Sequence, residues 1–260
     1  MTRRDFLKAM AATLAAGPVL LARRPARASE LNRFRVAQVT VGDHAPARPD
    51  AAFVLGQEVR FRTAVDVKLD RVIVPLASKA VFDYPFLLWV GDGTFPDLDP
   101  AELANLRQFL SSGGLLLVDN AGDGAALAAF DHQFRAQLRR AFPEVALATV
   151  PDQHVLMRSF YRVGSVWGRR ALRPFLEGLT LEDRLALVYS QNDLSGAWSR
   201  DGFGNWEFEA VPGGPAQRES AIRLGVNVVL YALLLDYKDE QAHVDYLLRR
   251  RRLRPEDPAR

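Results

Sequence analysis

Polar side chains follow three apolar segments of the chain, each at the point where the segment ends. The three segments end at Val90, Val118 and Tyr189. Carboxylate and amide oxygens bind polar ligands and hard cations, and a carboxylate can also serve as a general base. The oxygen-bearing residues that follow the segments are Asp92, Asp119, Asn120, Asp123, Ser190, Asn192 and Asp193. The sequence therefore predicts a polar ligand-binding site built from three strand ends.

A hard divalent metal such as Ca²⁺ or Mg²⁺ is one candidate ligand for these oxygens. Asp119 and Asp123 are the candidate metal ligands. Their spacing lacks the regular pattern of an EF-hand loop. The sequence thus contains two candidate metal ligands but no recognised metal-binding motif.

Catalysis would require a nucleophile or a proton carrier beside the carboxylates. Ser190 ends a strand, but the chain contains no Gly-x-Ser-x-Gly elbow. Asp119 or Asp193 could act as a base or metal ligand, with His154 or His243 as the proton carrier. A hydrolase of polar or glycan-like substrates is therefore an alternative. It requires a histidine within hydrogen-bond reach of the carboxylates.

Two larger side chains are candidates for the walls of the site. Trp198 could stack on a sugar ring or fill the core. Arg218 belongs to Gln217-Arg218-Glu219 at the start of a predicted helix. This triplet could pair with Asp193 or Asp201 in a buried polar network.

The chain contains no cysteine. A thiol nucleophile, an iron–sulfur cluster and a cysteine zinc site are therefore excluded, and stability must come from the core rather than from disulfides.

Residues 1–28 have the features of a twin-arginine export signal. Arg3 and Arg4 precede Lys8 and the apolar run Ala9–Ala22, and Ala26-Arg27-Ala28 is a small-x-small cleavage site. The apolar run is shorter than the roughly 20 residues that span a bilayer. We therefore expect a protein that folds in the cytoplasm, is carried by the twin-arginine machinery and acts in the periplasm, without a transmembrane span after processing.

The positive charge of the whole chain belongs to that signal. Residues 1–28 hold six of the 34 Lys/Arg and one of the 31 Asp/Glu residues, which leaves 28 basic and 30 acidic residues. Nucleic-acid binding is therefore not expected. A run of arginines remains at Arg249–Arg252 and Arg254, and a basic tail over residues 249–260 could dock on an envelope-associated complex.

The pattern of apolar residues predicts one three-layer α/β domain over residues 29–260. Strands are expected at 34–41, 72–74, 85–90, 115–118 and 184–189. Helices are expected at 50–63, after Asp99 with Glu102 in a capping box, at 127–142 and at 217–235. About forty residues before the strand at 184 are expected to be irregular. The alternation predicts a doubly wound, mostly parallel, flavodoxin-like sheet.

From about Phe34 to Arg252 the chain also resembles the bacterial domain-of-unknown-function family 4159. The motifs that carry the resemblance are Tyr84–Gly91, Gly113–Asp119, Phe130-Asp131, Phe134-Arg135, His154, Arg158–Tyr161, Leu176–Gly178, Tyr189–Leu194, Gln217–Glu219, Leu224–Asn227, Tyr237–Asp239, Gln241 and His243. The resemblance implies a fold similar to class I glutamine amidotransferases. Those enzymes need a cysteine nucleophile, so glutamine hydrolysis by that route is excluded here.

These observations favour an exported, non-catalytic, amidotransferase-like domain that binds a polar ligand or a protein partner at the carboxyl ends of its strands. The periplasmic hydrolase and the assembly factor of an envelope complex stay open as alternatives.

Overall fold

The computed structural model of the protein describes residues 34–42 and 44–252, with side chains as far as Leu235. These residues belong to one compact unit, Phe34–Arg260. The predicted export signal, residues 1–28, lies outside the described residues, as does the predicted basic tail except for the backbone of Arg249–Arg252.

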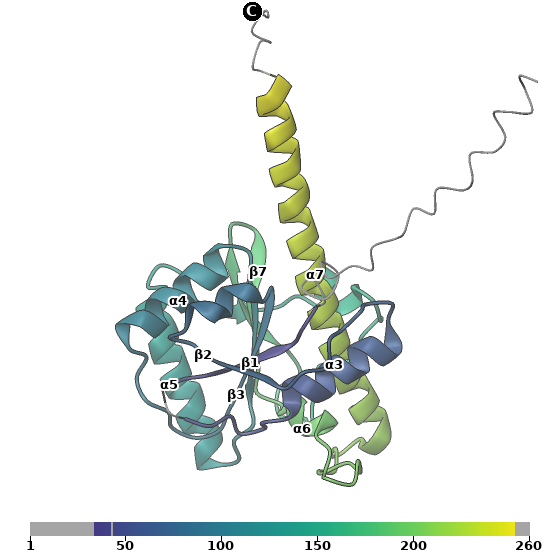
Figure 1. Cartoon of the computed structure of the whole chain (residues 1–260). Coiled ribbons are helices and arrows are strands. Elements are labelled where there is room, and N and C mark those ends of the chain that lie inside the picture. Colours follow the sequence, from purple (N-terminus) through teal and green to yellow (C-terminus); the bar gives the residue numbers. More distant parts are fainter. Residues whose placement is uncertain (1–33, 43, 253–260) are drawn as a thin grey trace, which may run out of the picture. The chain divides into compact units, whose positions relative to one another are not determined.

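Within the described residues, seven strands form one sheet in the order β2-β1-β3-β4-β7-β6-β5 (Figure 1). The parallel strands are β1 (Ala37–Thr40), β2 (Val72–Pro75), β3 (Phe86–Gly91), β4 (Leu115–Asn120) and β7 (Arg184–Ser190). The antiparallel strands are β6 (Glu177–Leu181) and β5 (Ala148–Thr149). The parallel part has the flavodoxin-like order, and the predicted fold class is confirmed.

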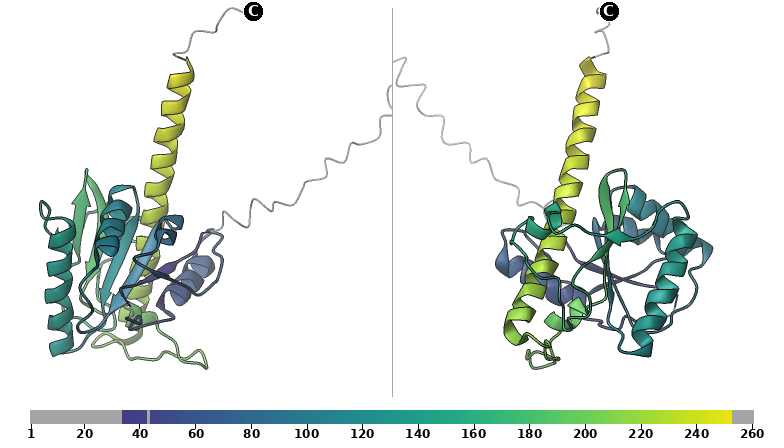
Figure 2. Two further views of the ribbon diagram at one scale, coloured as in Figure 1. Left: turned by 60° about the vertical axis from the view of Figure 1, so that its left-hand side comes forward. Right: turned by 180° about the vertical axis from the view of Figure 1, so that it is seen from behind.

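Helices cover both faces of the sheet, which gives the predicted three layers (Figure 2). Two short 3₁₀ helices, η1 (Lys79–Asp83) and η2 (Val155–Arg158), lie in the connections. One hydrophobic cluster joins the sheet to α3 (Ala51–Arg62), α6 (Leu194–Trp198) and α7 (Gly214–Arg252). A second joins it to α4 (Pro100–Ser111) and α5 (Ala125–Ala141).

The central strands are apolar because both of their faces are covered. Every residue of β3 and β4 is buried, as expected for parallel strands between two helical layers. The predicted capping box begins α4: Glu102 N donates to Asp99 Oδ1 over 2.7 Å, and Asp99 N donates to Glu102 Oε2 over 2.9 Å. Gly225 brings α7 close to α3 and α6, since a Cβ there would lie 2.9 Å from Leu55 and 3.0 Å from Trp198.

The structure corrects the prediction that the stretch before residue 184 is irregular. That stretch contains β5, η2 and β6, and β6 pairs antiparallel with β7. The connecting residues Glu182 and Asp183 both have positive φ, at 48° and 63°. This is the conformation of a tight hairpin turn, which usually carries asparagine or glycine. The last helix also begins earlier than predicted, at Gly214.

Among the described residues, no helix combines the length and the apolar content needed to cross a bilayer.

Candidate functional site

The three predicted polar segments meet at one edge of the sheet. Strands β3, β4 and β7 are parallel neighbours, so their last residues, Gly91, Asn120 and Ser190, lie side by side. We call this border of the sheet, with the residues that follow each strand, the carboxyl edge. Ligands of doubly wound sheets bind outside the carboxyl ends, where the strand order reverses. Here the order reverses between β1 and β3.

Asp119 lies at the carboxyl end of β4 and is fully buried. Its Oδ1 accepts a hydrogen bond from Leu194 N over 2.8 Å. Its Oδ2 accepts from Ser195 N over 2.7 Å and from Ser195 Oγ over 2.6 Å. Burial, followed by the charge of Asp193, raises the pKa of Asp119 to about 6, although the bonds from Ser195 and Leu194 oppose this rise. The side chain therefore fastens the start of α6 to β4.

Asp193 is also fully buried and occupies the turn between β7 and α6 in the left-handed conformation, with φ 50°. Its Oδ1 accepts from Gly196 N over 2.9 Å and caps α6. Its Oδ2 binds Arg48 Nη2 at 2.9 Å and also Arg169 Nε. The Arg48 guanidinium lies over the ring of Phe208, 4.0 Å from its centre. Two arginines thus neutralise one buried carboxylate.

Asp123, the second candidate metal ligand, lies on the surface and binds two arginines. Its side chain is 69% exposed and forms ion pairs with Arg169, at 3.1 Å, and with Arg170. Among the residues with described side chains, no three His, Asp or Glu side chains are grouped as a metal would require. Asp119 and Asp123 face different partners, so the described carboxylates do not fit the predicted metal pair.

The amide and hydroxyl groups predicted to bind ligand are engaged with the protein itself. Asn192 Oδ1 accepts from Leu172 N and Arg173 N, and its Nδ2 donates to the carbonyls of Val166 and Arg173. Ser190 Oγ accepts from Asn192 N over 3.1 Å.

Asn120, at the end of β4, is satisfied in the same way. Its Oδ1 accepts from Gly122 N, and its Nδ2 donates to Leu127 O over 2.9 Å and to the Tyr189 hydroxyl over 3.3 Å. These residues therefore hold the carboxyl edge together.

The two predicted wall residues are buried. Trp198 is fully buried, and its indole N–H donates to Ala51 O over 3.2 Å, so it fills the core. Arg218 donates to the carbonyls of Ala197 and Phe208 and lies over the ring of Trp206. The predicted pairing of Gln217-Arg218-Glu219 with Asp193 or Asp201 is wrong. Gln217 donates to Gly168 O, and Glu219 pairs with Arg62 and Arg223. Asp201 binds Phe203 N and Asn205 within its own turn.

His154 lies near the amino-terminal ends of the parallel strands, whereas the carboxylates lie at their carboxyl ends. Its Nδ1 accepts from Leu156 N over 3.2 Å, and its ring packs edge-on against Tyr231 at 5.4 Å. Tyr231 is hydrogen-bonded to the backbone of Leu185, near the start of β7, whereas Ser190 ends that strand. Five residues of strand span about 16 Å. The side chain of His243 lies outside the described residues.

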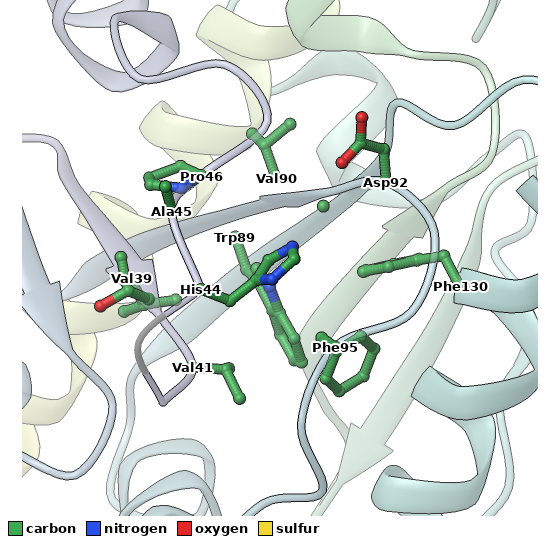
Figure 3. A pocket seen from close by; sticks show the side chains of 12 residues that line it. Val39, Val41, His44, Ala45, Pro46, Trp89, Val90, Asp92, Phe95 and Phe130 are labelled. Atoms are coloured by element: carbon green, nitrogen blue, oxygen red, sulfur yellow. The ribbon is translucent and has the colours of Figure 1, made fainter. Parts of the chain in front are cut away.

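A narrow crevice opens at the reversal of strand order between β1 and β3 (Figure 3). Its apolar lining includes Trp89, Phe95 and Phe130, and it has a free space of about 10 Å³. The imidazole of His44, from the loop after β1, lies in the middle of the lining beside Trp89, and Asp92, after β3, lies at the rim (Figure 3). Both residues are exposed. Of the predicted ligand-binding residues, Asp92 is the one that lines this opening.

Sequence reasoning missed Arg48, Arg169 and His44 as members of the carboxyl edge. Arg48 lies 145 positions from its partner Asp193, and no local pattern signals an ion pair at that separation. A signal for His44 was available, because it follows the first strand at the point where the strand order reverses.

The raised pKa of Asp119 predicts a specific pH dependence. The folded protein holds the Asp119 proton more tightly than the unfolded chain, so this group lowers the free energy of unfolding as the pH rises from about 4 to 6. ¹³C NMR of the Asp119 carboxyl group should give a midpoint near pH 6. In urea unfolding, Asp119→Asn should remove this contribution, which is at most about 3 kcal/mol. A midpoint near pH 4 would contradict the prediction.

Two comparisons with known proteins complete the description of the site. A family model described as "Domain of unknown function (DUF4159)" matches residues 35–233. No curated protein matches the chain.

Proposed function

The chain belongs to the DUF4159 family of domains of unknown function, and on that premise we propose that it is an exported binding domain. Its carboxyl edge would receive a polar group from a ligand or a partner protein at the crevice between β1 and β3. The observation that carries the proposal is the crevice itself, whose lining combines aromatic rings with two exposed polar side chains of different chemistry, His44 and Asp92.

The dimensions of the crevice favour a partner's side chain over a whole cofactor. A free space of about 10 Å³ admits about one water molecule or a terminal group of similar size. A carboxylate at Asp92 and an imidazole at His44 offer an acceptor and a titratable group to such a terminus. We therefore favour a polypeptide segment that inserts one polar side chain.

A non-catalytic role is supported by how the buried carboxylates are used. Each carboxylate oxygen of Asp119 and Asp193 accepts at least one hydrogen bond from the protein. A general base must reach the proton that it removes, and neither of these side chains is exposed. Both therefore act as structural anchors of α6 and its flanking loops.

One observation supports the hydrolase alternative: an imidazole, His44, and a carboxylate, Asp92, both line the crevice (Figure 3). These two side chains would have to supply the proton transfer, in place of the predicted pairs with His154 or His243. Turnover of a panel of ester and glycoside substrates that disappears in His44→Ala would establish this alternative. Turnover unchanged by His44→Ala would remove it.

Export is proposed from the sequence of residues 1–28, and it places the partner in the periplasm. The experiment that tests both parts is photocrosslinking in cells, with a photoreactive amino acid at Asp92 of the full-length chain. We expect a discrete adduct with a periplasmic or envelope protein. Replacing Arg3 and Arg4 with lysine should retain the protein in the cytoplasm and abolish the adduct.

The matched control is the same photoreactive residue at Asp83. Asp83 is also an exposed aspartate, but it precedes β3, whereas Asp92 follows it. The two positions therefore report on opposite ends of one strand. Equal adducts at both positions, or none at Asp92, would contradict binding at the crevice. Export that survives the lysine substitutions would contradict the twin-arginine assignment.

A further inference from the structure

A strongly basic segment, which includes η2, connects β5 to β6. Residues 153–176, which we call the arginine arm, contain five arginines and no aspartate or glutamate. The rest of residues 29–260 contains more acidic than basic residues, so the positive charge is concentrated in this segment. None of these arginines lines the crevice, and the buried carboxylate of Asp193 pairs with Arg169 alone among them.

The first part of α7 holds the arm by a row of polar side chains. Asn227 Oδ1 accepts from Phe160 N and Tyr161 N, at 3.2 and 2.7 Å, and its Nδ2 donates to the carbonyls of Leu156 and Tyr161. Gln217 donates to the carbonyl of Gly168 over 2.7 Å. Ten residues of α-helix separate Asn227 from Gln217, a rise of about 15 Å. The arm therefore runs along α7.

The other end of the arm is fixed at the carboxyl edge. Asn192 makes four hydrogen bonds to the backbone of Val166, Leu172 and Arg173. Gly168 permits this close approach, because a Cβ there would lie 2.5 Å from Asn192 O and 2.6 Å from Asp193 O. The arm is thus a preorganised surface, fastened at both ends by buried asparagines.

The side chains that face away from these anchors are basic and apolar. Phe160, Trp167 and Leu172 are exposed by 47%, 37% and 44%. Arg158, Arg162 and Arg173 are exposed as well. Within residues 34–42 and 44–235, no carboxylate forms an ion pair with these three arginines. Arg169 and Arg170, in contrast, are neutralised by Asp193 and Asp123.

We propose that the arginine arm docks the domain on the surface of an anionic phospholipid bilayer. Arginine fits phosphate groups through two parallel hydrogen bonds. Each basic residue close to an anionic membrane contributes about 1 kcal/mol to binding. Three unpaired arginines on one strip supply that attraction.

The exposed apolar side chains favour a bilayer over an acidic protein. Trp167 and Phe160 alternate with the arginines along the arm, and aromatic rings partition into the interface between headgroups and acyl chains. An acidic polypeptide could pair with the arginines, but its binding would not require exposed aromatic side chains between them. The acidic side chains at the arm are otherwise engaged or marginal. Asp193 and Asp123 pair with Arg169 and Arg170, and Glu219 pairs with Arg62 and Arg223. Asp152 and Glu177 lie at the two margins of the arm.

The test compares binding to two kinds of vesicle, using the mature chain, residues 29–260. One kind is phosphatidylcholine with phosphatidylglycerol, and the other is phosphatidylcholine alone. We expect co-sedimentation with the anionic vesicles at low salt, reversed by high salt. We also expect a blue shift of tryptophan fluorescence that is lost in Trp167→Phe.

The decisive variant is Arg158→Gln/Arg162→Gln, which should weaken partitioning about 30-fold, a factor equivalent to about 2 kcal/mol. The matched control is Arg60→Gln/Arg139→Gln, which removes two exposed arginines from α3 and α5 and should retain binding. Urea unfolding checks that both variants are folded.

Three results would overturn the proposal. The first is equal binding by the arm variant and the control variant. The second is loss of binding only when the tail arginines, Arg249–Arg252 and Arg254, become glutamine. The third is binding to soluble polyglutamate without binding to anionic vesicles, which would indicate an acidic protein partner. None of these results bears on crosslinking at Asp92, so the two proposals fail separately.

Discussion

Replacing Asp193 with alanine is expected to lower the free energy of unfolding by about 3–5 kcal/mol. The substitution leaves Arg48 and Arg169 without their shared buried counter-charge. It also removes the acceptor for Gly196 N at the start of α6 and places alanine at a φ of 50°. Urea unfolding of residues 29–260, followed by circular dichroism, measures the change.

Two companion variants separate the causes of this loss. Asp193→Asn keeps a side-chain oxygen for Gly196 N and a residue that tolerates positive φ, but it removes the charge. Its stability should fall between those of the wild type and Asp193→Ala. Asp123→Ala removes the exposed carboxylate that pairs with Arg169 and Arg170, and should cost about 1 kcal/mol or less. Equal losses for Asp193→Ala and Asp123→Ala would show that Asp193 is not a structural anchor.

Replacing Asn227 with alanine should release the first part of the arginine arm and cost about 3 kcal/mol of stability. The change leaves the N–H groups of Phe160 and Tyr161 and the carbonyls of Leu156 and Tyr161 without their side-chain partner. Amide hydrogen exchange should therefore accelerate at Phe160 and Tyr161 under conditions in which β3 and β4 remain protected.

The matched control for Asn227 is Asn205→Ala. Asn205 is an exposed asparagine whose amide donates to Asp201 within its own turn. Its removal should cost about 1 kcal/mol or less, since water can replace the bond. Unchanged exchange at Phe160 in Asn227→Ala would mean that the arm is held by other contacts.

The elements that could be predicted are those with a strong local signal. The strands that end at Val90, Val118 and Tyr189 are continuous apolar runs, and burial on two faces requires that pattern. The helix after Asp99 is fixed by its own capping box. Both depend on neighbours in sequence, so they could be identified without the tertiary structure.

The hairpin of β6 and β7 could not be predicted, because its turn carries no such local signal. Glu182 and Asp183 form its turn with positive φ, although neither is glycine or asparagine. The strand pairing, not the intrinsic preference of the turn residues, stabilises this conformation.

For the candidate site, the sequence could predict which strand ends meet but not which of their side chains remain accessible. Three strand ends were expected at one edge, and the structure brings them together. Which oxygens stay open to solvent was not predictable, because Arg48 and Arg169 reach Asp193 from loops far apart in sequence. The oxygens of Asp119, Asn120 and Asn192 are likewise occupied by backbone groups that only the tertiary structure identifies.

The position of α7 in the chain limits when the domain can complete its fold. This helix packs against α3 and α6, and its Asn227 anchors the arm, which precedes it by some 70 residues. In a chain emerging from the ribosome, the layer that α7 shares with α3 and α6 therefore stays incomplete until the last helix is available. We expect cotranslational intermediates to expose the apolar face of β3 and β4, and closure to follow synthesis of Asn227 as a late, non-local step.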